Sequence, residues 1–176
     1  SINEISKNTV LLNNQEAFIP VTKLADKKFV SVNLGFEHQT AFDSLLNKYA
    51  DVKSLTAEKY KDSATLNDLA DDLKFYNTIF ISVNDQIAKS GRYLNFISDV
   101  AQHKNVVIAV FGDGKNLSAF DNISSPIIWS PQNSLEAAMV TPQFIFGGIA
   151  AAMVGSVFNA KSSPLITDTG CAISKS

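Results

Sequence analysis

The sequence predicts a doubly wound α/β domain, in which a mostly parallel sheet is covered by helices on both faces. Short, nearly continuous apolar runs alternate with longer segments whose apolar residues recur at helical spacing. The apolar runs lack the polar alternation of a half-exposed strand, which is typical of parallel strands buried on both faces. A chain of 176 residues that is 45% hydrophobic has the size of one such domain.

Five segments have the strand pattern: residues 29–34, 52–55, 79–83, 106–111 and 127–129. Helical spacing follows in residues 42–49, 66–73 and 93–101, and a further helix is expected to begin near Ser134. This rhythm predicts right-handed βαβ crossovers. The expected product is a five- or six-stranded α/β/α sandwich with the flavodoxin-like order 2-1-3-4-5, and a Rossmann order is the alternative.

The two ends of the chain fall outside this repeat. Residues 1–158 are expected to form one domain, with residues 1–21 as a lead-in that packs outside the sheet or adds an edge strand. Residues 159–176 have the composition of a tail or the start of an interdomain linker. The initial Ser suggests a trimmed or processed product. Pro142 is expected to break or kink the last helix.

Composition argues against several classes of partner. The net charge is −2 without a basic stripe, which disfavours nucleic acid. Arg92 is the only arginine, so a bidentate guanidinium clamp is also disfavoured. Cys171, the only cysteine, is interpreted as a free thiol that makes neither an internal disulfide nor a cysteine-based zinc site. No apolar run reaches the length of a membrane span, and no cofactor or metal is expected.

Ligands of such folds bind outside the carboxyl ends of the strands. The loops there supply the candidate substrate-rim or ligand-loop residues Glu37, His38, Asp85, Asp113, Lys115 and Asn133. Glu37 and His38 could form an acid/base pair, although an ordinary solvated loop is the favoured interpretation. The loop 112–116 could present backbone N–H groups to an anion, but a tight turn is again favoured.

Familiar catalytic motifs are missing from these loops. Only Gly35 follows the first strand where a dinucleotide fingerprint needs three glycines, and no Gly-x-Ser-x-Gly nucleophile elbow occurs. Asp85 has the position of a receiver-domain phosphoacceptor, but the acidic pair is missing and Ser130–Pro131 replaces the required lysine. The sequence therefore predicts no self-sufficient catalytic site, and no catalytic residue is assigned.

Several segments together resemble the second, α/β domain of family 3 glycoside hydrolases. The resemblance covers most of residues 8–158 and is nearest to the β-N-acetylhexosaminidase branch found in bacteria. Residues 113–114 read Asp-Gly where the family turn has Asn-Pro, and residues 155–158 depart from the expected Gly-x-Leu-Pro. The segments that carry the resemblance are Asn8–Asn14 with Phe18–Val21, Asp26–Leu34, Phe111–Leu117 and Phe146–Ala151.

The resemblance implies a retaining glycosidase as the parent molecule. In that family the nucleophilic Asp, and in this branch an Asp–His acid/base pair, belong to a preceding catalytic barrel, which is the implied partner together with carbohydrate. In some branches of the family the second domain supplies a Glu as the acid/base. Glu37 is the only carboxylate in this sequence that could be nominated for that role. A periplasmic or surface location is favoured by resemblance, and a cytoplasmic one stays open.

Three functional hypotheses follow. The first is an accessory domain of a sugar hydrolase, which predicts no turnover by the chain alone and an exposed apolar patch where the barrel docks. The second is an independent small-molecule-binding or receiver-like module with a pocket at the strand ends. The third, and least favoured, is a small enzyme in which Glu37, His38 and Asp113 converge.

Overall fold

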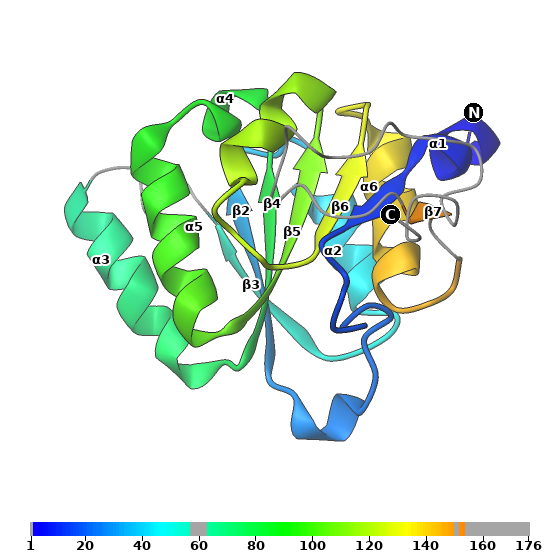
Figure 1. Cartoon of the computed structure of the whole chain (residues 1–176). Helices are drawn as coiled ribbons and strands as arrows, with labels where there is room; N and C mark the ends of the chain where they lie inside the picture. Colours follow the sequence, from blue (N-terminus) through cyan, green and yellow to red (C-terminus); the bar gives the residue numbers. More distant parts are fainter. Residues whose placement is uncertain (1, 57–62, 150–151, 154–176) are drawn as a thin grey trace.

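The protein is built around one twisted sheet (Figure 1). A computed structural model describes residues 2–56, 63–149 and 152–153. Seven strands lie in the order β3-β2-β4-β5-β6-β1-β7, and the first five of these are mutually parallel. The strands are β1 (Val10–Leu12), β2 (Phe29–Leu34), β3 (Val52–Thr56), β4 (Thr78–Val83), β5 (Asn105–Phe111), β6 (Ile127–Ser130) and β7 (Ala152–Met153).

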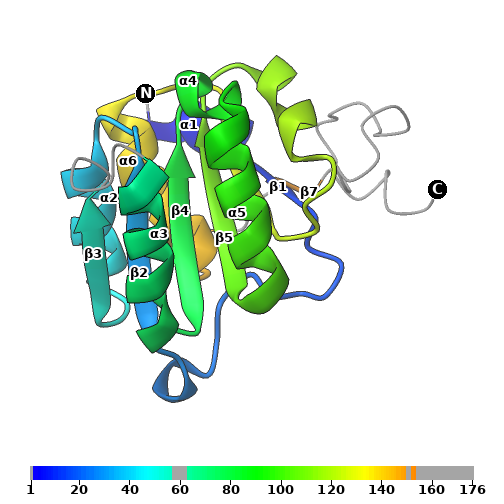
Figure 2. The same ribbon diagram turned by 90° about the vertical axis from the view of Figure 1, so that its left-hand side faces the viewer.

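Helices cover both faces of the sheet (Figure 2). One layer contains α1 (Ile2–Asn8), α2 (Gln39–Leu46) and α6 (Leu135–Ile145). The other contains α3 (Ser63–Asp72), α5 (Gly91–His103) and the 3-10 helix η4 (Gly114–Phe120). Shorter elements are η1 (Leu24–Asp26), η3 (Leu73–Phe75) and α4 (Asp85–Ala88). The predicted doubly wound fold is confirmed.

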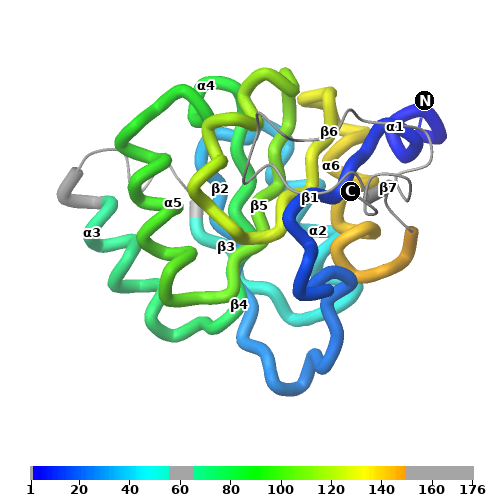
Figure 3. The backbone as a smooth tube through the Cα atoms, in the orientation of Figure 1, coloured from blue at the N-terminus to red at the C-terminus, as the bar shows by residue number. Residues whose placement is uncertain are grey.

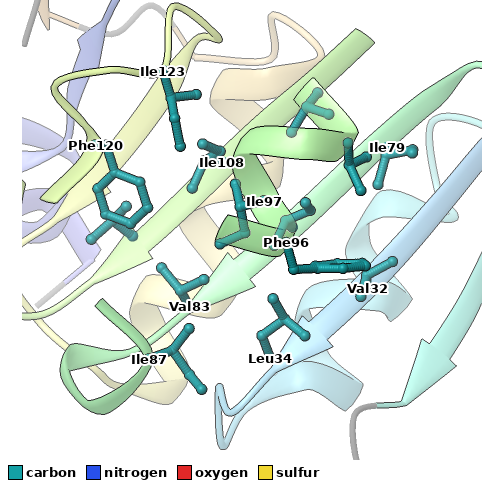
Figure 4. Packing of buried hydrophobic residues seen from close by; sticks show 14 of the residues in the cluster. Val32, Leu34, Ile79, Val83, Ile87, Phe96, Ile97, Ile108, Phe120 and Ile123 are labelled. Carbon is teal, nitrogen blue, oxygen red and sulfur yellow. The ribbon is translucent and has the colours of Figure 1, made fainter. Parts of the chain in front are cut away.

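The core consists of two hydrophobic clusters, one on each face of the sheet. Alternate side chains of a strand point to opposite faces, so Ile79 and Ile81 pack under α3 and α5 while Phe80 packs under α2 and α6. Figure 4 shows the first cluster, in which Phe96 and Ile97 of α5 lie over Val32 and Ile108. Every residue of β4 is buried, as its unbroken apolar run predicts.

The strand order β3-β2-β4-β5-β6 is the predicted flavodoxin-like order, and the Rossmann alternative is wrong. Among the described residues the sheet has seven strands rather than five or six, because the lead-in segment and the two-residue strand β7 both join it. β1 pairs antiparallel with β6 and parallel with β7, so the lead-in adds to the sheet edge (Figure 3).

A break or a kink was expected at Pro142, and the break is wrong, because α6 continues to Ile145. Pro142 lies in the last half of α6, and its missing N–H removes one backbone hydrogen bond of the helix without ending it. The neighbouring Thr141 hydroxyl donates to the Ala137 carbonyl at 2.7 Å.

The tail 159–176, with Cys171, lies outside the described residues. In the described part of the chain, no helix combines the length and apolarity needed to cross a membrane.

Candidate functional site

The carboxyl ends of the parallel strands meet at the edge that carries α4, at the top of Figure 1. All six predicted site residues belong to loops or short helices that follow these strands. Glu37 and His38 follow β2, Asp85 follows β4, Asp113 and Lys115 follow β5, and Asn133 follows β6. Since parallel strands end at one edge, the topology brings these segments to one side of the molecule.

Asp85 holds the loop after β5 in place. Its carboxylate accepts hydrogen bonds from the backbone N–H of Asp113 at 2.9 Å and from Nδ2 of Asn116 at 2.6 Å. The Asp113 carboxylate in turn accepts from the backbone N–H of Lys115 at 2.9 Å and caps η4. The carboxylate in the receiver-like position is therefore occupied by structural contacts.

Two glycines allow this close packing. Gly112 has φ of 141°, and a Cβ atom there would lie 2.3 Å from Oδ1 of Asp85. A Cβ on Gly114 would lie 2.8 Å from the Trp129 ring. The Trp129 indole N–H donates to the Gly112 carbonyl at 2.9 Å. The favoured interpretation of loop 112–116 as a tight turn thus agrees with its internal contacts.

The turn after β2 is fixed by two asparagines and an aromatic stack. Asn33 donates to the Phe36 carbonyl at 2.7 Å and accepts from the Phe36 N–H at 2.6 Å. Asn84 caps α4 by accepting from the Ile87 N–H and donates to the Gly35 carbonyl at 2.8 Å. The Phe36 ring stacks on Phe111, with centroids 3.8 Å apart.

Glu37 and His38 stand at the rim of this edge. Glu37 is exposed, and the half-buried His38 ring contacts Phe36 with centroids 5.7 Å apart. Within residues 2–56, 63–149 and 152–153, no hydrogen bond or ion pair joins either residue to Asp85 or Asp113. Lys115 and Asn133 are exposed. The described contacts therefore give the converging-enzyme hypothesis no support.

Sequence reasoning missed a polar network under α2. Gln39 donates to Ser31 Oγ at 2.8 Å and to Asp43 Oδ1 at 2.6 Å, and it accepts from Ser82 Oγ at 2.6 Å. Ser54 donates to the other Asp43 oxygen. Burial raises the pKa of the Asp43 carboxyl above its ordinary value, and hydrogen bonds from Ser31, Ser54 and Gln39 oppose that rise.

Asp43 opens onto a hollow of about 690 Å³ beside the ends of β2 and β3. Most of its lining residues have polar side chains, among them Asn33, Glu37, Thr40 and Asn47. A signal was present in the sequence, because Ser31 and Ser82 are isolated polar residues in buried strands. Gln39 and Asp43 stand four residues apart, on one face of α2, which places both over these serines. The hollow offers hydrogen bonds to a polar ligand without a nucleophile–base pair.

No described part of the chain gathers three or more His, Cys, Asp or Glu side chains that could hold a metal ion. The sequence matches no protein-family model and no curated protein. Solved structures, in contrast, match the fold.

The first similar structure is a fungal multi-domain family 3 β-N-acetylglucosaminidase, with TM-score 0.72 and 11% identity, and the match covers 86% of this chain and 18% of that one. A family 3 β-N-acetylglucosaminidase from Paenibacillus sp. gives TM-score 0.68 and 14% identity over 85% and 30% of the two chains. This chain resembles one α/β domain of family 3 glycoside hydrolases. A β-glucosidase from Listeria innocua gives TM-score 0.60 and 15% identity over 84% and 24%.

The family 3 resemblance read from the sequence is confirmed at the level of the fold. The chain spans less than a third of the length of each of these enzymes. The matched region is therefore one domain of a larger architecture, and most of each enzyme has no counterpart here.

Proposed function

We propose that this chain is an accessory domain of a family 3 glycoside hydrolase of the β-N-acetylglucosaminidase or β-glucosidase type. It packs on, or rims, a catalytic barrel that the 176 residues do not include. The observation that carries this proposal is the lopsided coverage, in which 84–86% of this chain matches only 18–30% of each enzyme. A (β/α)8 barrel alone needs roughly 250 residues.

The carboxyl edge supports an accessory role. The carboxylates of Asp85 and Asp113 accept hydrogen bonds from loop atoms, and in the described part of the chain neither Glu37 nor His38 forms a hydrogen bond or ion pair with them. A retaining glycosidase needs two carboxyl groups roughly 5–5.5 Å apart with access to the sugar. The polar hollow beside Asp43 and the exposed Glu37 suit a rim that contacts substrate held by another domain.

The start of α6 supports a docking surface for that barrel. Leu135 and Met139 stand one turn apart and are 49% and 43% exposed. They lie near the carboxyl edge because α6 begins soon after β6 ends. Paired exposed apolar side chains are typical of a surface that a neighbour covers, and the barrel is the neighbour that the longer family 3 enzymes supply.

The test is the complete reading frame that contains this sequence. We expect it to encode a barrel domain, and we expect the complete polypeptide to hydrolyse 4-nitrophenyl N-acetyl-β-D-glucosaminide or the corresponding glucoside. The 176-residue chain alone should show no turnover of either substrate. A frame without a barrel, or hydrolysis by the chain alone, would contradict the proposal.

A docking variant tests the packing separately. Leu135→Glu with Met139→Glu should lower the midpoint of thermal unfolding of the complete enzyme more than that of the 176-residue chain. Lys89→Glu, an exposed change at the end of α4, is the control. Equal shifts in both proteins would show that α6 does not face the barrel.

A further inference from the structure

A second hollow lies at the opposite, amino-terminal edge of the sheet, beside η1. Figures 1 and 2 show the η1 segment at the lower end of the ribbon. It encloses about 490 Å³ between η1, the segment leading into β3, and η3. It shares no lining residue with the hollow beside Asp43. The two hollows are therefore separate sites at opposite ends of the parallel strands.

The lining of this amino-edge hollow is basic in a protein whose net charge is −2. Lys27, Lys28 and Lys53 line it, and Asp51 is the only carboxylate among the lining residues. The Asp51–Lys53 pair is 3.6 Å apart with both side chains well exposed, so water weakens its attraction. Positive charge is left in excess, and an anionic ligand would complement it.

Aromatic rings line the same hollow. Phe75 is 65% exposed, with the ammonium group of Lys74 5.2 Å from its ring centroid. Tyr49 stacks on Phe146 at 5.1 Å with an interplanar angle of 8°, which fixes its orientation. Tyr76 adds a third, half-buried ring. An exposed aromatic face gives an apolar surface on which a flat ligand can pack.

The walls of the hollow are held rigidly by Asn77. Its side chain accepts from the Lys28 N–H at 2.9 Å and donates to the Asp26 carbonyl at 3.1 Å. Its own N–H donates to the Lys28 carbonyl at 3.1 Å. These bonds tie the loop before β2 to the turn before β4. A site with a fixed backbone loses less conformational entropy when a ligand binds.

We infer that the amino-edge hollow binds an oligosaccharide that carries carboxylate or sulfate groups. The C–H face of a sugar ring packs against Phe75, and the acidic groups lie near Lys28 and Lys53. The anionic character follows from the lysines. The choice of a saccharide over another anion rests on the proposed function. The site serves to hold an acidic glycan away from the carboxyl edge.

Calorimetric titration of the 176-residue chain tests this inference. Tetragalacturonate should bind with one-to-one saturation, whereas neutral chitotetraose should not compete. The double variant Lys28→Gln, Lys53→Gln should weaken binding about tenfold, and Phe75→Ala should weaken it with the lysines intact. Lys89→Gln removes the same kind of charge outside the hollow and should bind as the unaltered chain does. Circular dichroism confirms that each variant is folded.

Three results would overturn the inference: no saturable binding at millimolar tetragalacturonate, equal losses in the hollow variants and Lys89→Gln, or equal competition by hexaglutamate. The last result would show that the hollow recognises negative charge and does not select a saccharide. The outcome is separable from the accessory-domain proposal, because this titration needs no barrel and the hydrolysis test does not use this hollow.

Discussion

The Asp85 carboxylate accepts the backbone N–H of Asp113 at 2.9 Å and so links the loop after β4 to the loop after β5. Asn116 donates to the same oxygen at 2.6 Å. This oxygen therefore has two donors from one loop. The acidic residue whose position most resembles that of a phosphoacceptor serves here to order the carboxyl edge.

Replacing Asp85 by Ala should destabilise the protein by roughly 1–2 kcal/mol, because both donors lose their charged acceptor and water replaces it only in part. Urea unfolding at neutral pH measures the change. Asp85→Asn keeps a carbonyl oxygen at this position and should lose less than Asp85→Ala. If the two variants were equally unstable, the hydrogen bonds would not be the source of the effect.

Gly112→Ala should destabilise the protein by about 1–3 kcal/mol. The left-handed φ of 141° strains any side chain, and the added Cβ would meet the Asp85 carboxylate at 2.3 Å. Gly91→Ala is the matched control, since nothing lies within 4 Å of its Cβ position and the residue begins α5. That control should be neutral or slightly stabilising. The measurement is the midpoint of thermal unfolding of both variants. Equal changes in the two midpoints would contradict the steric argument.

Relative to the unaltered protein, Asp43→Asn should gain stability as the pH rises above the ordinary Asp pKa of about 3.9. Burial raises the pKa of Asp43, so the folded state takes up a proton more readily than the unfolded chain. Its contribution to stability is complete below the unfolded pKa and is lost as the pH rises through the folded pKa. The amide variant does not titrate and escapes this loss.

The measurement for Asp43 is urea unfolding of both proteins at a series of pH values from about 4 upward. Asp68→Asn, which removes an exposed carboxylate from α3, is the control for a general change in net charge. If the free energy of unfolding of Asp43→Asn relative to that of the unaltered protein fell as the pH rose, the direction assigned to the Asp43 pKa shift would be wrong.

Phe36→Ala should be among the most damaging substitutions, at about 3–5 kcal/mol. The ring is 1% exposed and stacks on Phe111, so its removal leaves a cavity under the turn after β2. Phe75→Ala removes a ring that is 65% exposed and should change stability by less than about 0.5 kcal/mol. Chemical unfolding of the pair compares the two environments, and similar losses would contradict the packing argument.

Hydrophobic periodicity predicted the parallel strands well, because a strand buried on both faces has a nearly continuous apolar run. β4, from Thr78 to Val83, is the clearest case. The edge strands were harder. β1 has only three residues, and its place beside β6 depends on pairing across more than a hundred residues, which local pattern does not encode.

The sequence predicted where the candidate site residues lie, but not which atoms their side chains contact. Strand ends identified the loops of Asp85 and Asp113, but not that the Asp85 carboxylate binds the loop backbone. The Gln39–Asp43 network was missed because it joins a helix to three different strands. Only the tertiary structure places Ser31, Ser54 and Ser82 beneath one helix.

The pairing of β1 with β7 has a consequence for how such a domain can be carried by a longer polypeptide. Val10 lies opposite Ala152 in the register, so the first and the last described strands are neighbours in the sheet. A domain whose first and last strands are neighbours can be inserted between two other parts of a polypeptide, because the two connections lie close together. The five parallel strands all lie on one side of the β1–β7 pair, so a domain with this topology could be duplicated, exchanged or lost as one unit.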